Sequence, residues 1–337
     1  MGRVLSWSDP EIIRLLQEQF IPVTHDDWYQ RRRQDEDGRF FRSVVDQTWK
    51  GGDWDDSGGP TRQGVYCFTP AGRMLTEMKN VSRDPAAVRD ILARALRAWN
   101  DLPADQKKRG AFPSANPERD PNHTRPVPSG ALVLRQYSRP LKLDGGRKYV
   151  AEPLKFEDTL VGPQHERAWI LKSEWKALVP QNPKRGEAVA IPASLKNRLL
   201  RFHLVGALLG EPGHWEREHI RSEALKLTVE SVSEADLRLV LAGPVLLSTE
   251  PDVKSARCGF DGAVTGVLSY DRKKQVFDRF DVVVVAETWG SLNTLAPERH
   301  PGRSVIGSVF ELGGDKPTDQ VPPHWARVPQ EYLEGAP

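Results

Sequence analysis

The stretch Trp7–Gln30, WSDPEIIRLLQEQFIPVTHDDWYQ, decides how the N-terminal part of the chain is interpreted. Ser8 or Asp9 can cap a helix, and Pro10 occupies the first helical position, where its missing N–H costs nothing. The apolar residues that follow fall on one face at helical spacing as far as Phe20. The run FIPVTHDD then predicts a short, largely buried strand.

Three further segments follow in the N-terminal third. Residues 35–47, DEDGRFFRSVVDQ, predict a second helix, and residues 64–75, GVYCFTPAGRML, predict a hairpin with its turn at PAG. Residues 84–103 predict an amphipathic helix that is capped by Asp84. The predicted order is helix, strand, helix, hairpin and helix, over a length typical of one domain.

This order resembles the thioredoxin-like fold family, in which a helix leads to a buried strand and a hairpin precedes the last helix. The resemblance covers residues 3–103 and predicts a thioredoxin-like α/β domain over residues 1–104. The family's redox CxxC stands ahead of the first helix, where this chain reads VLSWSDPE without a cysteine. The family's cis-proline is replaced by Arg62 and Gln63. Because a thiol is the nucleophile of that chemistry, the resemblance implies a redox-inactive domain, with Cys67 a buried, inert thiol in its strand.

The surface that would carry the CxxC is a candidate ligand-binding surface in this chain. Asp26, Asp27 and Arg62 would lie near it, and adjacent acids can also ligate a cation. The alternative is that Asp26 and Asp27 cap the next segment and pair with the arginines that follow them.

Bulk properties exclude several classes of protein. The 48 Lys+Arg and 46 Asp+Glu residues nearly cancel, so the chain lacks the basic excess of a general nucleic-acid binder. It has no run of 18 apolar residues that could span a membrane. Its two cysteines, Cys67 and Cys258, are too few for a cysteine-built zinc site or disulfide scaffold, and a single disulfide stays open. The N-terminus has no apolar signal core, which is expected of a cytoplasmic protein or of an exported one whose signal has been removed.

A segment rich in proline, asparagine and charge, residues 105–130, predicts a linker. Residues 131–337 then predict a mainly antiparallel β-rich domain, a curled sheet or a closed barrel, with helices near 172–179 and 193–203. The predicted fold class of the whole chain is therefore α+β. This larger part matches no nucleotide-binding, P-loop, hydrolase or zinc-protease motif.

The densest group of histidines suggests a metal site in the β-rich domain. His203, His214 and His219 lie within 17 residues of sequence together with several glutamates, and imidazole with carboxylate suits a divalent transition metal. His214 and His219 lie on different faces of a regular helix, so both reach one ion only if the segment bends. The alternative is that these two are solvated and that His203 packs at a helix end.

A second candidate site lies at the end of the strand VVVVA. Glu287 follows this apolar run, and a carboxylate there is costly unless it pairs, hydrogen-bonds or binds a cation. If the two segments meet, Glu287 and His203 would be the catalytic pair of a pocket, with Trp289 and Arg201, or alternatively Arg279, binding the ligand. The alternative is a buried Arg–Glu pair that holds the end of the sheet.

Two hypotheses of function follow from these patterns. In the first, a redox-inactive thioredoxin-like domain is joined to a β-rich domain that binds a small molecule or a protein. In the second, the β-rich domain is a metal-dependent enzyme, hydrolytic or oxidative, with the metal at His203, His214 and His219 and with Glu287 as a further ligand or as the base.

Overall fold

The computed structural model describes residues 7, 9–49, 62–79, 84–108, 120, 125–146, 148–151, 154–156, 159–161, 164–206, 213–292 and 302–333. The chain divides into two compact units, residues 1–125 and 126–337. The division falls within the segment predicted as a linker.

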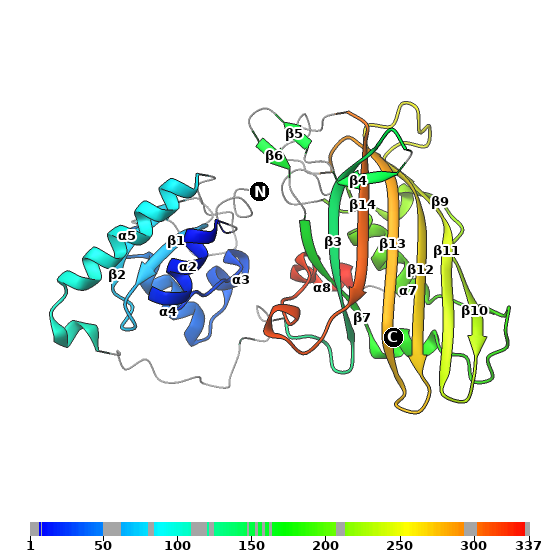
Figure 1. Ribbon diagram of the computed structural model, residues 1–337, viewed down its shortest axis with the longest axis horizontal. Helices are drawn as coiled ribbons and strands as arrows, with labels where there is room; N and C mark the ends of the chain where they lie inside the picture. Colours follow the sequence, from blue (N-terminus) through cyan, green and yellow to red (C-terminus); the bar gives the residue numbers. More distant parts are fainter. Residues whose placement is uncertain are drawn as a thin grey trace. The chain divides into compact units, whose positions relative to one another are not determined.

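Helices and one hairpin make up the described part of the first unit (Figure 1). Asp9 caps the first helix by accepting hydrogen bonds from the N–H groups of Glu11 and Ile12, and Pro10 begins it, as predicted. The elements are α2 (Pro10–Gln19), α3 (Asp27–Arg32), α4 (Glu36–Val45), β1 (Gly64–Phe68), β2 (Met74–Lys79), α5 (Pro85–Asp101) and a 3₁₀ turn, η1 (Ala104–Lys107).

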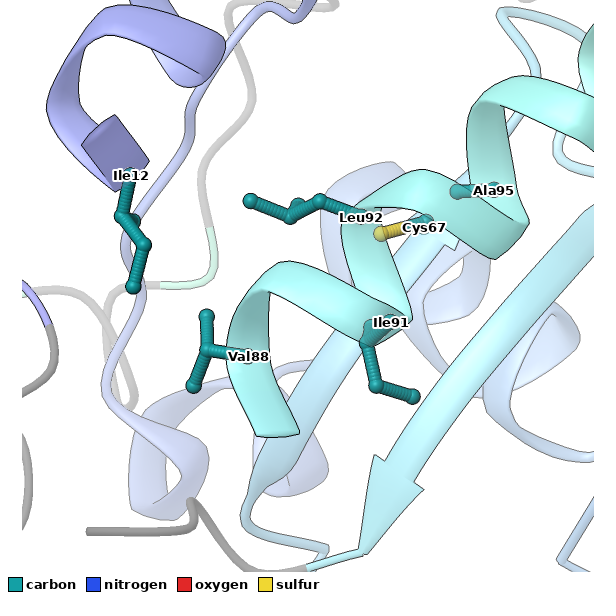
Figure 2. Packing of buried hydrophobic residues seen from close by; sticks show 6 residues of the cluster. All are labelled: Ile12, Cys67, Val88, Ile91, Leu92 and Ala95. Carbon is teal, nitrogen blue, oxygen red and sulfur yellow. The ribbon is translucent and has the colours of Figure 1, made fainter. Parts of the chain in front are cut away.

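The core of this unit lies between α2, α5 and the hairpin. Figure 2 shows Val88 and Leu92 of α5, Ile12 of α2 and the thiol of Cys67 on β1 gathered in it. Ile12, Val88 and Leu92 are almost fully buried, so the apolar faces of α2 and α5 both point into the same core.

The structure confirms the three predicted helices and the hairpin, and it shows one prediction to be wrong. Residues 20–26 form no strand, and Ile21 and Val23 are 86% and 65% exposed. Within the described residues, the sheet of this unit consists of β1 and β2 alone. The larger central sheet that the resemblance implies is therefore not seen there, and membership of the thioredoxin-like family stays a prediction.

The second unit is dominated by one large antiparallel sheet. Its strands are β3 (Leu132–Leu143), β4 (Tyr149–Ala151), β7 (Gln164–Ile170), β8 (Ala188–Val189), β9 (Ile220–Glu223), β10 (Lys226–Val232), β11 (Asp236–Ser248), β12 (Gly259–Asp271), β13 (Val276–Trp289) and β14 (Ser304–Leu312). A separate hairpin pairs β5 (Leu154–Phe156) with β6 (Thr159–Val161).

The strand order of this sheet is β4-β3-β14-β13-β12-β11-β10-β8, with β7 also pairing with β3 and β9 with β11 (Figure 1). The strands from β10 to β14 follow one another as a meander, and β3 then pairs antiparallel with β14. The mainly antiparallel, β-rich prediction is confirmed. Among the described residues, β8 and β4 lie at opposite ends and do not pair with each other, so the sheet is open, and of the two predicted forms, a curled sheet or a closed barrel, the closed one is not seen.

The two faces of the sheet differ in composition, as period-two alternation requires. On β12, Phe260, Val264 and Leu268 are buried, and we call their side the inner face. Val283 of β13 and Val309 of β14 are more than two-fifths exposed and lie on the other side, the outer face.

Short helices and turns complete the unit: α6 (Lys172–Ala177), α7 (Ala193–Arg198), a π-helical turn η2 (Leu199–His203), 3₁₀ turns η3 (Arg217–His219), η5 (Pro317–Asp319) and η6 (His324–Arg327), and α8 (Pro329–Tyr332). The helices predicted near 172–179 and 193–203 correspond to α6 and to α7 with η2. The segment after β14 packs into this unit, because Asp319, Ala326 and Tyr332 are almost fully buried.

Candidate functional site

His203 lies at the end of η2, in a buried cluster of polar side chains. Its Nε2 is 2.8 Å from the hydroxyl of Tyr332, and its Nδ1 is 3.0 Å from Oε1 of Gln136. Because the Tyr332 hydroxyl accepts the N–H of Trp169, its own proton can be donated to Nε2. Nδ1 then carries the imidazole proton and donates it to Gln136. Both ring nitrogens are therefore engaged, and neither offers a lone pair to a metal or substrate.

Burial lowers the pKa of His203 to about 3, and the positive charge of Arg198 acts in the same direction. The side chain is consequently neutral in the folded protein at physiological pH. It acts as a hydrogen-bonding link between η2, β3 and α8, and not as a general base that exchanges protons near neutrality.

The low pKa of His203 predicts a measurable loss of stability in mild acid. The unfolded chain binds a proton at this residue below about pH 6.5, while the folded protein does not bind it until about pH 3. Stability is therefore complete above pH 6.5 and is lost as the pH falls. Between pH 7 and pH 5, the free energy of unfolding should fall by about 2 kcal/mol more in the wild type than in His203→Gln.

Urea titrations at the two pH values measure this difference. Glu166 acts in the opposite direction, because burial raises its pKa to about 7, but it is present in both proteins and cancels in the comparison. Equal pH dependence in wild type and His203→Gln would contradict the assignment.

A buried ion pair lies next to this cluster. Two guanidinium nitrogens of Arg198 lie 2.7 and 2.9 Å from the two carboxylate oxygens of Glu174, and both side chains are almost fully buried. Glu174 also accepts the N–H of Leu171 and the hydroxyl of Ser194, while Arg198 donates to the carbonyl of Tyr332. The pair joins α6, α7 and α8. Both the carboxylate and the guanidinium make further hydrogen bonds, as a buried ion pair requires.

The other two histidines of the predicted metal site lie elsewhere. The ring of His214 stacks on Phe202 with centroids 5.3 Å apart, and its Nε2 lies 3.1 Å from a carboxylate oxygen of Glu216. His219 accepts the N–H of Glu216 through its Nδ1. Within the part of the chain that the structure describes, no group of three or more His, Cys, Asp or Glu side chains could hold a metal ion. The structure thus does not bring His203, His214 and His219 to one centre.

The residues of the predicted catalytic pocket are also separated. Glu287 lies on the outer face, about half exposed, and forms an ion pair with Arg303, whereas His203 is buried among inner-face side chains. Trp289 is buried and donates its indole N–H to the carbonyl of Ala256 at 2.9 Å. The alternation of side chains along β13 places Glu287 on the exposed face, so its carboxylate has no cost of burial that a partner would have to offset.

Arg201, predicted to bind the ligand beside Trp289, also has a structural role. It is buried, and its Nε donates to the carbonyl of Trp215 at 2.8 Å. Its guanidinium lies 4.9 Å from the ring centroid of Phe202, a cation–π contact. These contacts hold the segment after η2 against the helix.

In the first unit, the structure brings Asp27 and Arg62 together. The Asp27 carboxylate accepts the N–H of Arg62 at 3.1 Å and lies 3.4 Å from Nε of Arg31, and burial raises the pKa of Asp27. Asp26 caps α3 by accepting the N–H of Trp28, as the capping alternative predicts. The guanidinium of Arg62 lies 4.7 Å from the ring centroid of Trp49. Most of these contacts order the backbone around α3.

Both cysteines are buried free thiols, so they form no disulfide with each other. Burial raises the pKa of Cys67 and also that of Cys258, which disfavours the nucleophilic thiolate. Neither thiol is thus suited to exchange with a disulfide substrate.

The inner face of the large sheet encloses an apolar cavity against α7 and η2. The helical wall is formed by Leu195, Leu199 and Leu200, and the strands contribute most of the rest. The lining residues of the sheet are Leu134, Leu227, Leu241, Val264, Leu268, Phe280, Val282, Val284 and Phe310. Lys196 is the one charged residue of the lining among the described residues.

The cavity has a volume of about 60 Å³. This exceeds the roughly 10–15 Å³ that one water molecule needs, but its apolar walls give a water molecule almost no partners. It is less than half of the roughly 150 Å³ cavity known to bind benzene, and well below the pockets of drug-sized ligands. Lining residues such as Lys196 and Leu199 are only partly buried, so a flexible chain that extends out of the space fits it better than a rigid ring.

No motif in the sequence marks this cavity. The alternating leucines of 225–241 and the apolar stripe of the helix near 193–203 indicate two buried surfaces, and those surfaces are the two walls. Whether the helix and the sheet leave a cavity between them depends on the distance that separates them, and the sequence pattern of neither element contains this distance.

Comparison with known proteins finds no matching family model, no matching curated protein and no matching solved structure for this chain. Among the described residues, no helix has both the length and the apolarity needed to cross a membrane.

Proposed function

We propose that the second unit binds a narrow, apolar, chain-like ligand in the cavity between its sheet and the α7–η2 helix. The observation that carries this proposal is the lining of the cavity, which is apolar except for Lys196. Concave, mostly apolar pockets with few polar groups are the usual form of small-molecule sites.

The energetics of packing support this reading. A void of this size costs about 1.4 kcal/mol, taking roughly 24 cal/mol per Å³, and a chain that fills it recovers the lost contacts. The cavity lies beside a π-helical turn, η2, and single π-helical turns occur frequently at functional sites.

In the same proposal, the first unit is a redox-inactive thioredoxin-like domain. Its α2, α4, hairpin and α5 occur in the order that the resemblance implies, although the strand expected at residues 20–26 is absent, and its CxxC position holds no cysteine. The burial and raised pKa of Cys67 support the absence of thiol exchange. The metal-dependent alternative has no support in the placement of His203, His214 and His219.

Binding can be tested with n-pentane, the simplest ligand of the proposed shape. In protein with ¹³C-labelled Leu and Val methyl groups, saturating the buffer with n-pentane should shift the resonances of Leu199, Leu227 and Val264. Those of Val283 and Val309, on the outer face, should stay unchanged. Shifts absent from the cavity residues, or equal on both faces, would refute the proposal.

A matched pair of variants strengthens the test. Val264→Phe places extra volume on the inner face and should reduce the n-pentane shifts of Leu199 and Leu227 to a small fraction of their wild-type size. Val283→Phe makes the same change on the outer face and should leave them intact. Circular dichroism of both variants checks that the sheet is formed.

A further inference from the structure

The outer face of the large sheet carries an apolar strip where an antiparallel sheet normally presents polar residues to solvent. The strip consists of Val283 and Val285 on β13 and of Val305, Gly307 and Val309 on β14, which adjoin because the two strands pair in this register. Val283 is 43% exposed and Val309 is 41% exposed. Contiguous apolar surface of this kind marks an interaction surface. We call these five residues the outer strip.

Two exposed charges of opposite sign flank the outer strip. Arg139 on β3 lies on one side of it, since it pairs with Gly307, and Asp261 on β12 lies on the other, since it pairs with Glu287 on β13. Three strand spacings separate the two charges, about 14 Å. Within the part of the chain that the structure describes, neither side chain makes a hydrogen bond or an ion pair.

The surroundings of Asp261 favour a further cation. Asp261 lies directly opposite Glu287 across the β12–β13 pair, and like charges in this position destabilise a sheet. Arg303 forms an ion pair with Glu287, so the carboxylate of Asp261 has no counter-ion of its own. A guanidinium supplied by a partner would therefore be bound favourably at this corner of the outer face.

A surface with a cation on one side of an apolar strip and an anion on the other is complementary to a second copy of itself. A two-fold axis in the interface, midway between the two charges, brings Arg139 of each copy to Asp261 of the other. The outer strips then lie between these two ion pairs. Such isologous two-fold interfaces are the commonest in homo-oligomers, and face-to-face packing of two sheets buries side chains in this way.

We infer that the outer face of the large sheet is a homodimer interface, in which two copies of the chain stack their outer strips and exchange Arg139–Asp261 ion pairs. The inference is independent of the proposed function, because the cavity lies on the inner face. It assigns a partner to the apolar residues that alternation places in solvent.

Sedimentation velocity of the full-length wild type should show a monomer–dimer equilibrium in the micromolar range. In protein with ¹³C-labelled methyl groups, dilution should shift the resonances of Val283 and Val309 and leave that of Val264 on the inner face unchanged. A wild type that stays monomeric up to about 100 μM overturns the inference, whatever else covers the outer face.

Exchanging the charges tests the reciprocal ion pairs. Arg139→Asp places two acids together at both contacts, and Asp261→Arg places two arginines together, so each variant alone should dimerise at least about tenfold more weakly than the wild type. Mixed in equal amounts, the two variants restore both opposite-charge contacts and should associate with each other about as tightly as the wild type. Failure of the mixture to associate overturns the inference.

A matched pair of valine variants tests the outer strip. Val283→Lys places a charge in the strip and should weaken dimerisation at least about tenfold, because the ammonium would be buried between the sheets. Val276→Lys changes an equally exposed valine, 44% exposed at the far end of β13, and should leave dimerisation unchanged. Circular dichroism checks the fold of each variant, and a dimer that tolerates Val283→Lys lies elsewhere on the chain and overturns the inference.

Discussion

Replacing Glu174 with glutamine is expected to lower the free energy of unfolding of the second unit by about 3–5 kcal/mol. The change keeps the shape of the side chain and removes its charge, so the guanidinium of Arg198 is left almost fully buried without a counter-ion. Loss of a partner from a buried pair is among the few single changes with an effect of this size. Urea unfolding followed by tryptophan fluorescence measures it.

An exposed pair provides the matched control. Arg279 and Asp281 on β13 form a contact of 2.6 Å with both side chains nearly half exposed. Asp281→Asn should therefore change the free energy of unfolding by no more than about 1 kcal/mol. The double variant Arg198→Met/Glu174→Gln should lose less than the sum of the single losses, because no unpaired charge remains. A small effect of Glu174→Gln, similar to that of Asp281→Asn, would contradict the structural role of the pair.

The second large effect is expected at Tyr332, where replacement by alanine should cost about 3–5 kcal/mol, as for other buried aromatic residues. Its ring packs on Phe202 and Trp169, with centroids 5.4 and 6.2 Å away. Its hydroxyl contacts His203 and accepts the N–H of Trp169. The substitution thus removes both the packing and a polar link between α8 and the core.

Two further variants divide this effect into its parts. Tyr332→Phe keeps the ring and removes the hydroxyl, so it should cost about 1–3 kcal/mol through the unsatisfied His203 ring nitrogen. Tyr149→Ala, at a tyrosine that is 48% exposed on β4, should change stability little. Urea midpoints of the three proteins provide the comparison, and equal losses for Tyr332→Ala and Tyr149→Ala would rule out the proposed anchoring of α8.

The long strands of the second unit were predictable because their local and tertiary requirements agree. In residues 226–248, leucines alternate with polar residues, and the turn between β10 and β11 lies where SVSEAD interrupts the pattern. The cap formed by Asp9 and Pro10 is equally local, since it depends only on the first turn of α2. Such features need no information from distant parts of the chain.

The wrong and missing predictions depend on distant partners. Residues 20–26 are apolar enough for a strand, but a strand needs a neighbour to hydrogen-bond, and Ile21 instead faces solvent. The run VVVVA predicts that Glu287 is buried. Valine occupies both the inner and the outer positions of this run, so its composition does not indicate on which face Glu287 lies. The segment after β14 is rich in proline and charge, a composition typical of exposed chain. Tyr332 is nevertheless buried, because its hydroxyl contacts His203, which is distant in the sequence.

The pairing of β3 with β14 has a consequence for biosynthesis. Ser138 and Ser308 share a hydroxyl hydrogen bond across this pair although they are 170 positions apart in the chain. While the ribosome is still adding residues before 304, one edge of β3 and one edge of β13 have no neighbour, and such open edges recruit other strands. The sheet therefore cannot be completed until β14 has been synthesised. Chains that end before residue 304 should aggregate and be recovered in the insoluble fraction.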